Sequence, residues 1–80
     1  MRAKQPALVI TFSSTAEAMA TEKYCAEHGL PGRLIPVPRE ITAGCGLAWK
    51  AAVEDQETLT QALSAAGIHC QEARVLDLWA

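Results

Sequence analysis

The 80-residue sequence lacks an apolar run long enough to cross a membrane. A membrane-spanning helix needs about 20 apolar residues, whereas the apolar stretch after the basic N-terminus runs only from Ala7 to Ile10. That stretch is also shorter than the apolar region of a secretory signal peptide. We therefore expect a cytoplasmic protein that does not interact with membranes.

Basic residues are few and scattered. The sequence has 7 Lys and Arg against 9 Asp and Glu, which gives a formal net charge of -2. Proteins that bind nucleic acids gather Lys and Arg into a patch or stripe that neutralises phosphates. The sequence contains no such cluster, so nucleic acid is not an expected partner.

Cysteine is also scarce and occurs in an odd number. Cys25, Cys45 and Cys70 are far apart, and no Cys or His pair has the spacing of zinc ligands. This pattern argues against a disulfide framework and against a metal site. We expect neither a metal nor a cofactor.

The strand and helix signals that are present predict one small α+β domain over residues 1–80. Runs rich in β-branched residues indicate strands. A segment is expected to be helical where hydroxyl residues or acidic residues precede it as N-caps and a glycine follows it. The expected elements are a strand over 7–12, a helix from about 15 to 28, a strand over 33–36, a strand over 47–53, a helix from Glu54-Asp55 to Gly67 and a strand over 69–78.

The order strand, helix, strand, strand, helix, strand is that of the ferredoxin-like split βαββαβ fold. With right-handed crossovers, it predicts a four-stranded antiparallel sheet with two helices on one face. The first and third strands lie in the centre of this sheet. Alternation along the third strand predicts that Leu47, Trp49 and Ala51 face the helices, while Ala48 and Lys50 face the open side.

This topology gives Cys45 a position. The loop over residues 37–46 is expected at the same end of the sheet as the end of the first strand and the start of the first helix. Free amides at a helix N-terminus and a nearby cation lower the pKa of a thiol, and Arg39 supplies a cation on the same loop. Such a thiolate can accept sulfur or selenium as a persulfide or selenopersulfide. The other residues predicted to bind at this site are Ser13, Ser14, Thr15, Gly44 and Gly46.

Each of these residues also has an ordinary structural explanation. A single cysteine is commonly a small core residue, and serines before a helix commonly cap it. Arg39 can be a solvated loop residue that pairs with Glu40.

Position argues against two other kinds of thiol chemistry. His28 and His69 are assigned to the end of the domain away from Cys45, so no Cys–His pair is expected. Cys25 and Cys70 are also expected to be distant from Cys45, which leaves a thiol oxidoreductase without a resolving cysteine.

Five segments of the sequence carry a resemblance to a known family: Ile10–Thr15, Glu22–Lys23, Gly29–Pro31, Arg33–Ile41 and Gly44–Ala48. With these segments the chain resembles, over nearly its whole length, the small bacterial domain described as a selenium/sulfur carrier protein. The resemblance implies a ferredoxin-like fold, a carrier role for Cys45 and a place for Arg39 in the signature loop. Small polar residues are common before the cysteine in that family, whereas this chain has Ala43-Gly44.

Two functions stay open at this point. A carrier, rather than a complete enzyme, would take its atom from a donor such as a cysteine desulfurase or a selenocysteine lyase. It would pass the atom to an acceptor such as a selenophosphate-forming enzyme. The alternative is a non-covalent regulatory or interaction module, which binds a protein partner or a small anion held by Arg39 and the helix amides. The small residues Ala48 and Ala52, or the tail at Trp79, would also suit a homodimer.

Overall fold

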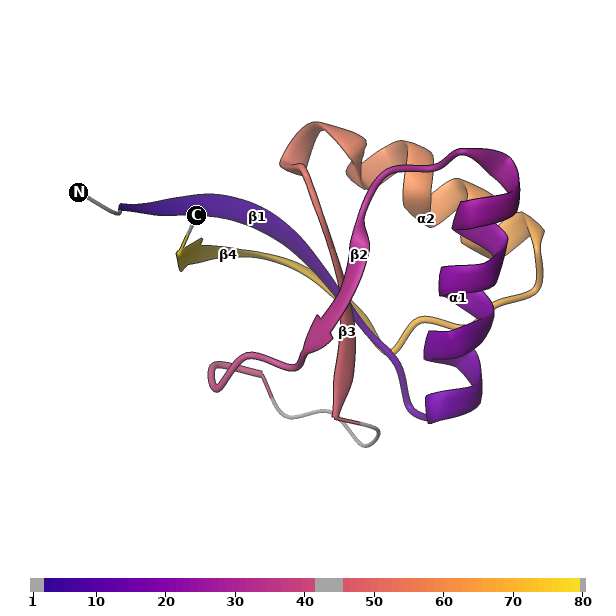
Figure 1. The fold of residues 1–80 in the computed structure, drawn as a ribbon, viewed down its shortest axis with the longest axis horizontal. Coiled ribbons are helices and arrows are strands. Elements are labelled where there is room, and N and C mark those ends of the chain that lie inside the picture. The colour runs from indigo at the N-terminus through magenta and orange to yellow at the C-terminus, as the bar shows by residue number, and fades with distance from the viewer. Residues whose placement is uncertain (1–2, 42–45, 80) are drawn as a thin grey trace.

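The computed structural model of the chain describes residues 3–41 and 46–79 (Figure 1). The predictions for Gly44 and Cys45 fall outside these residues. The elements are β1 (Lys4–Thr11), α1 (Thr15–His28), β2 (Arg33–Pro36), β3 (Leu47–Ala51), the 3-10 turn η1 (Val53–Asp55), α2 (Gln56–Ala65) and β4 (Glu72–Trp79). None of the helices in the described ranges is long and apolar enough to cross a membrane.

The strands form an antiparallel sheet in the order β2-β3-β1-β4. Both helices cover the same face of this sheet (Figure 1). Between the helices and the sheet lies a buried core of Leu8, Ile10, Phe12, Ala18, Cys25, Trp49, Ala51, Leu59 and Leu63. The predicted ferredoxin-like arrangement is confirmed, with β1 and β3 in the centre and β2 and β4 at the edges.

Both helices end at the predicted glycines. Gly29 follows α1 with a φ of 64°, and Gly67 follows α2 with a φ of 77°. After α2 the amide of Ile68 donates to the carbonyl of Leu63 at 3.0 Å, so the chain reverses in a Schellman motif. Glycine is favoured at both positions because a side chain makes a left-handed backbone costly.

The two faces of β3 are packed as the alternation predicts. Leu47, Trp49 and Ala51 belong to the core on the helix side. Ala48 belongs to a second cluster on the opposite face, where it is buried with Val9 of β1. Because Ala48 is already 0% exposed in a single chain, it contributes no free surface to a dimer interface. The homodimer stays a prediction.

β1 begins at Lys4, three residues before its predicted start, and includes Pro6. The register explains why a proline is accepted in a central strand. β3 pairs with β1 only from Leu8 onward, whereas β4 pairs with it from Lys4. Residues 4–7 therefore form a local sheet edge, the position in which strands tolerate proline. In Figure 1 this two-stranded end of β1 and β4 projects away from the helices.

The position at which β4 starts corrects the sequence analysis. β4 runs antiparallel to β1, with Glu72 opposite Thr11, so it starts at the end of the sheet where β1 finishes. His69 and Cys70 therefore lie at the same end as the start of α1, and not at the opposite end. The prediction did not take into account that α2, which starts at the far end of the sheet, returns the chain to the near end before β4 begins.

The strand itself also starts three residues later than predicted, at Glu72. The amide of Gln71 donates to the carbonyl of Thr11 at 2.7 Å, and the amide of His69 donates to a side chain of α1. Residues 69–71 therefore form a connection in which the amides of His69 and Gln71 are used outside the regular strand pairing.

Candidate functional site

The start of β3 fixes where the Cys45 loop enters the sheet. Leu47 pairs with Pro36 at the end of β2, and Ala48 pairs with Thr11 at the end of β1. The amide of Val37 donates to the carbonyl of Gly46 at 3.0 Å and closes the loop at its base. Cys45 and Gly44 lie outside the described residues, so the structure defines this site by its flanks. The predicted proximity of the loop base to the end of β1 is confirmed.

Glycine is favoured at position 46 because of its backbone conformation, and not because neighbouring atoms leave no room for a side chain. Its φ is 76°, a conformation that side chains rarely adopt, and a Cβ added there would meet no atom within 4 Å. Gly46 is itself exposed. The residue after Cys45 therefore turns the chain sharply into β3 and leaves open space beside it.

Ile41 anchors the other side of the loop. The amide of Ile41 donates to the carbonyl of Pro38 at 3.1 Å, which forms a turn with Arg39 and Glu40 at its exposed tip. The Ile41 side chain is 5% exposed and packs on Val9 and Ala48 on the open face of the sheet. This burial of an isoleucine fixes the turn against the sheet.

Arg39 does not pair with Glu40. Within residues 3–41 and 46–79, the ion pair observed is that of Arg74 with Glu72, at 3.7 Å. The guanidinium of Arg39 therefore remains available at the tip of the turn, two residues before the described part of the loop ends at Ile41.

The start of α1 is occupied by a carboxylate. Ser14 is the N-cap residue, and its hydroxyl accepts from the amide of Glu17 at 3.3 Å. The hydroxyls of Ser13 and Ser14 donate to Oε1 of Glu17 at 3.2 and 3.4 Å. The other carboxylate oxygen, Oε2, accepts from the amide of His69 at 2.8 Å. Glu17 thus links the first turn of α1 to the segment before β4.

This arrangement changes the expected electrostatics of the site. A negative side chain in the first turn of a helix compensates the partial positive charge of the exposed amides. The hydroxyls of Ser13 and Ser14, which were predicted to bind at the Cys45 site, donate hydrogen bonds to Glu17. The roles of Ser13, Ser14 and Thr15 at Cys45 stay predictions. Sequence reasoning did not include Glu17 among the site residues, although the spacing Ser14-x-x-Glu17 is the signature of a capping box.

Comparison with known proteins identifies a family. The model of the family described as putative Se/S carrier protein-like matches residues 7–73, which run from the middle of β1 to the start of β4. The chain belongs to this Se/S carrier family. The match confirms the resemblance carried by Arg33–Ile41 and Gly44–Ala48. No curated protein and no solved structure matches the chain.

In this member of the Se/S carrier family, the two cysteines that the structure describes, Cys25 and Cys70, do not readily deprotonate to thiolates. Cys25 is buried in the helix-side core, and burial raises the pKa of its thiol. Burial also raises the pKa of the Cys70 thiol, and the negative charge of Glu17 raises it further. Both groups are therefore protonated at neutral pH, and neither has the environment of a reactive cysteine.

Cys70 is nevertheless closer to the loop than the sequence analysis expected. β3 and β4 both start beside the end of β1, on its two sides. Two strands separated by one neighbour lie about 10 Å apart. Cys70 therefore belongs to the same end of the sheet as the base of the Cys45 loop. Among the residues that the structure describes, no group of three His, Cys, Asp or Glu side chains has the geometry of a metal site.

Proposed function

We propose that the protein carries sulfur or selenium, held on Cys45 as a persulfide or selenopersulfide and passed to a partner enzyme. The observation that carries this proposal is the match of the Se/S carrier family over residues 7–73, a range that includes Cys45. The raised pKa values of Cys25 and Cys70 support the same assignment, because those thiols are protonated at neutral pH.

The transfer is a thiolate exchange without net oxidation. The Cys45 thiolate attacks the terminal sulfur of a persulfide on the donor enzyme. A bond forms between Cys45 Sγ and that sulfur as the donor S–S bond breaks, and the donor cysteine leaves as a thiolate with the electron pair. An acceptor thiolate then attacks the terminal sulfur on Cys45, which returns to its thiolate. Selenium held on a donor cysteine moves by the same exchange.

The described surroundings of the loop support a role for Arg39. A persulfide adds a second heavy atom that carries negative charge, and Glu17 offers no compensation for it. The exposed guanidinium of Arg39 lies on the turn that Ile41 fixes to the sheet and pairs with no carboxylate of the described residues. We assign Arg39 as the cation that stabilises the loaded, anionic form.

The proposal implies particular partners and a particular setting. The donor would be an enzyme such as a cysteine desulfurase or a selenocysteine lyase, and the acceptor an enzyme such as a selenophosphate-forming enzyme. A cytoplasmic setting belongs to the proposal, because thiols are kept reduced there. The open space beside Gly46 is consistent with the approach of a partner's cysteine to the preceding residue.

Loading of the intact protein tests the proposal. Wild type is incubated with a cysteine desulfurase and cysteine, and the added sulfur is located by mass spectrometry of peptides. We expect sulfur on the Cys45 peptide, no loading of Cys45→Ser, and normal loading of the matched control Cys70→Ser. Equal loading of Cys45→Ser and wild type would refute the carrier role. It would favour the non-covalent module, for which binding of a protein or an anion must survive the substitution.

A further inference from the structure

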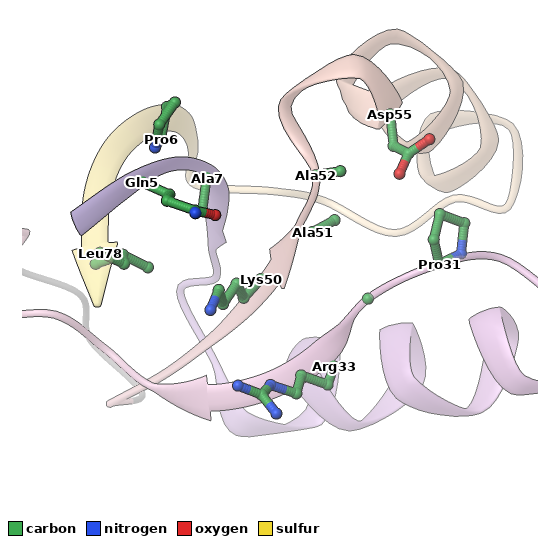
Figure 2. A pocket seen from close by; sticks show the side chains of 11 residues that line it. Gln5, Pro6, Ala7, Pro31, Arg33, Lys50, Ala51, Ala52, Asp55 and Leu78 are labelled. Atoms are coloured by element: carbon green, nitrogen blue, oxygen red, sulfur yellow. The ribbon is translucent and has the colours of Figure 1, made fainter. Parts of the chain in front are cut away.

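A cavity of about 480 Å³ lies at the end of the sheet opposite the Cys45 loop (Figure 2). Its origin is the early end of β3. β3 stops pairing with β1 at Leu8, while β1 continues to Lys4 on the far side of that point. The cavity is lined by the first part of β1, the entry to β2 and the end of β3. Its volume is within the range of small-molecule sites.

Two positive side chains line this cavity. Arg33 and Lys50 are directly opposite each other on β2 and β3. In Figure 2 both side chains extend toward the same side of the cavity. Like charges in directly opposed positions destabilise a sheet unless another charge compensates them.

No protein group supplies that compensation in the part of the chain that the structure describes. The ion pair found there joins Arg74 to Glu72, and neither Arg33 nor Lys50 takes part in one. Asp55 does line the cavity, but Figure 2 shows it on the opposite side from the charged ends of Arg33 and Lys50. The arrangement therefore leaves two adjacent cations facing a space that can hold an anion.

The rim of the cavity beside Arg33 is held in one position by packing. The buried indole of Trp49 donates from Nε1 to the carbonyl of Pro31 at 3.1 Å. Gly32 has a φ of 118°, and a Cβ added there would lie 2.7 Å from the carbonyl oxygen of Lys50 and nearer still to the Trp49 indole nitrogen. Only glycine fits this approach, so the entry to β2 and Arg33 are positioned by the core.

The rest of the lining selects for an organic ligand. Ala7, Ala51 and Leu78 contribute apolar surface. Asp55 is the N-cap residue of α2 but makes no capping hydrogen bond with its side chain, and its carboxylate instead lines the cavity. That carboxylate repels a second negative charge at the far end of a ligand. The site therefore combines a cationic end, an apolar wall and an acidic end.

We propose that this cavity is a second binding site, which holds a small organic anion with its carboxylate or phosphate group between Arg33 and Lys50. The remainder of the ligand is apolar and its far end is neutral or positively charged. The proposal does not depend on the carrier role of Cys45, because the cavity and the loop lie at opposite ends of β3.

Benzoate, phenyl phosphate and the uncharged benzamide are the probes that test this site. Each is titrated into the full chain and followed by the amide signals of Gly32, Arg33, Lys50 and Ala52 in two-dimensional NMR. We expect saturable shifts with a Kd of about 1 mM for the better anion, a value that small ligands reach at ordinary efficiency. Benzamide should bind at least about tenfold more weakly, because it lacks the charge. The stronger of the two anions identifies the head group as a carboxylate or a phosphate.

Substitutions locate the anion. Arg33→Gln and Lys50→Gln should each weaken binding by about tenfold, the effect of losing one charge-assisted hydrogen bond. Arg74→Gln is the matched control, because Arg74 is on the surface and does not line the cavity. Arg33 is exposed, so its substitution leaves the core intact even if Lys50→Gln perturbs folding. The proposal is overturned if neither anion shifts these signals, if benzamide binds as tightly as the anions, or if Arg33→Gln binds like wild type.

Discussion

Strand β3 joins two ends of the molecule that differ in charge and in construction. At its start, the carboxylate of Glu17 occupies the helix N-terminus and accepts three hydrogen bonds from side chains and an amide. At its end, Arg33 and Lys50 line a cavity and form no ion pair with any residue that the structure describes. The proposed thiol transfer belongs to the first end, and the proposed anion site belongs to the second.

The glycines at the two ends show the same difference. Gly46 needs glycine only for its positive φ and has open space around it, whereas Gly32 is in contact with Trp49 and the Lys50 backbone. The need for glycine therefore comes from the backbone conformation at the loop end. At the cavity end it comes also from close packing against the core. Substitutions should therefore have different consequences at the two ends.

The largest expected effect comes from Gly32→Ala. Strain at the positive φ and overlap with Trp49 together should lower the free energy of unfolding by about 4 kcal/mol. Gly46→Ala, the matched change at the loop end, carries only backbone strain and should cost about 1 kcal/mol. Urea unfolding of both variants measures the difference. Equal losses would mean that the rim of the cavity is not held by the core.

Ile41→Ala tests whether the loop depends on its anchor. Loss of this buried side chain should cost about 3 kcal/mol and slow persulfide loading of Cys45, because the turn that carries Arg39 is no longer fixed to the sheet. Benzoate binding at the cavity should not change. Ile41→Val, which retains most of the contact, serves as the control with a cost of about 1 kcal/mol. Undiminished loading of Ile41→Ala in its folded state would show that the anchor is irrelevant to the site.

Glu17→Gln is expected to have a small effect on stability, about 1 kcal/mol, from weaker capping and loss of the favourable charge at the helix N-terminus. It should also lower the pKa of the Cys70 thiol, because the charge of Glu17 contributes to raising it. The pKa of Cys25 is raised by burial alone, so its alkylation profile should not move. Alkylation of both cysteines against pH checks this prediction, and a parallel shift of the two profiles would refute it.

The same raised pKa values determine the sign of a pH effect on stability. A thiol whose folded pKa lies above its unfolded value of 9.0 keeps its proton longer in the folded state. Its contribution to stability is complete below pH 9.0 and is lost as the pH rises through the folded pKa. Glu17→Gln should therefore reduce the part of this alkaline loss that comes from Cys70.

Much of the fold was predictable from the sequence, because local signals and topology rules agree. The run from Ala7 to Phe12 and the glycines Gly29 and Gly67 indicated the first strand and the ends of the helices. The alternation along β3 indicated which of its side chains face the helices. The early start of β1 was not predictable, because Pro6 opposes a strand and only the pairing with β4 explains its place.

The candidate site was predictable only in part. The loop base and the end of β1 were placed correctly by the order of the elements. The contact of Glu17 with the His69 amide joins residues far apart in the sequence, and the error in placing His69 at the opposite end of the sheet hid it. The cavity was not predicted, because the register that places Arg33 opposite Lys50 and the early end of β3 at Ala51 are known only from the structure.

The reactivity of Cys45 tests the central claim most directly. The rate of alkylation of each cysteine is measured against pH by peptide mass spectrometry, with Cys25 and Cys70 as internal references. The carrier role predicts rapid alkylation of Cys45 with a midpoint below about 8.5, while the other two cysteines react slowly. Alkylation of Cys45 no faster than that of Cys25 and Cys70 would contradict the claim and assign Cys45 a structural role.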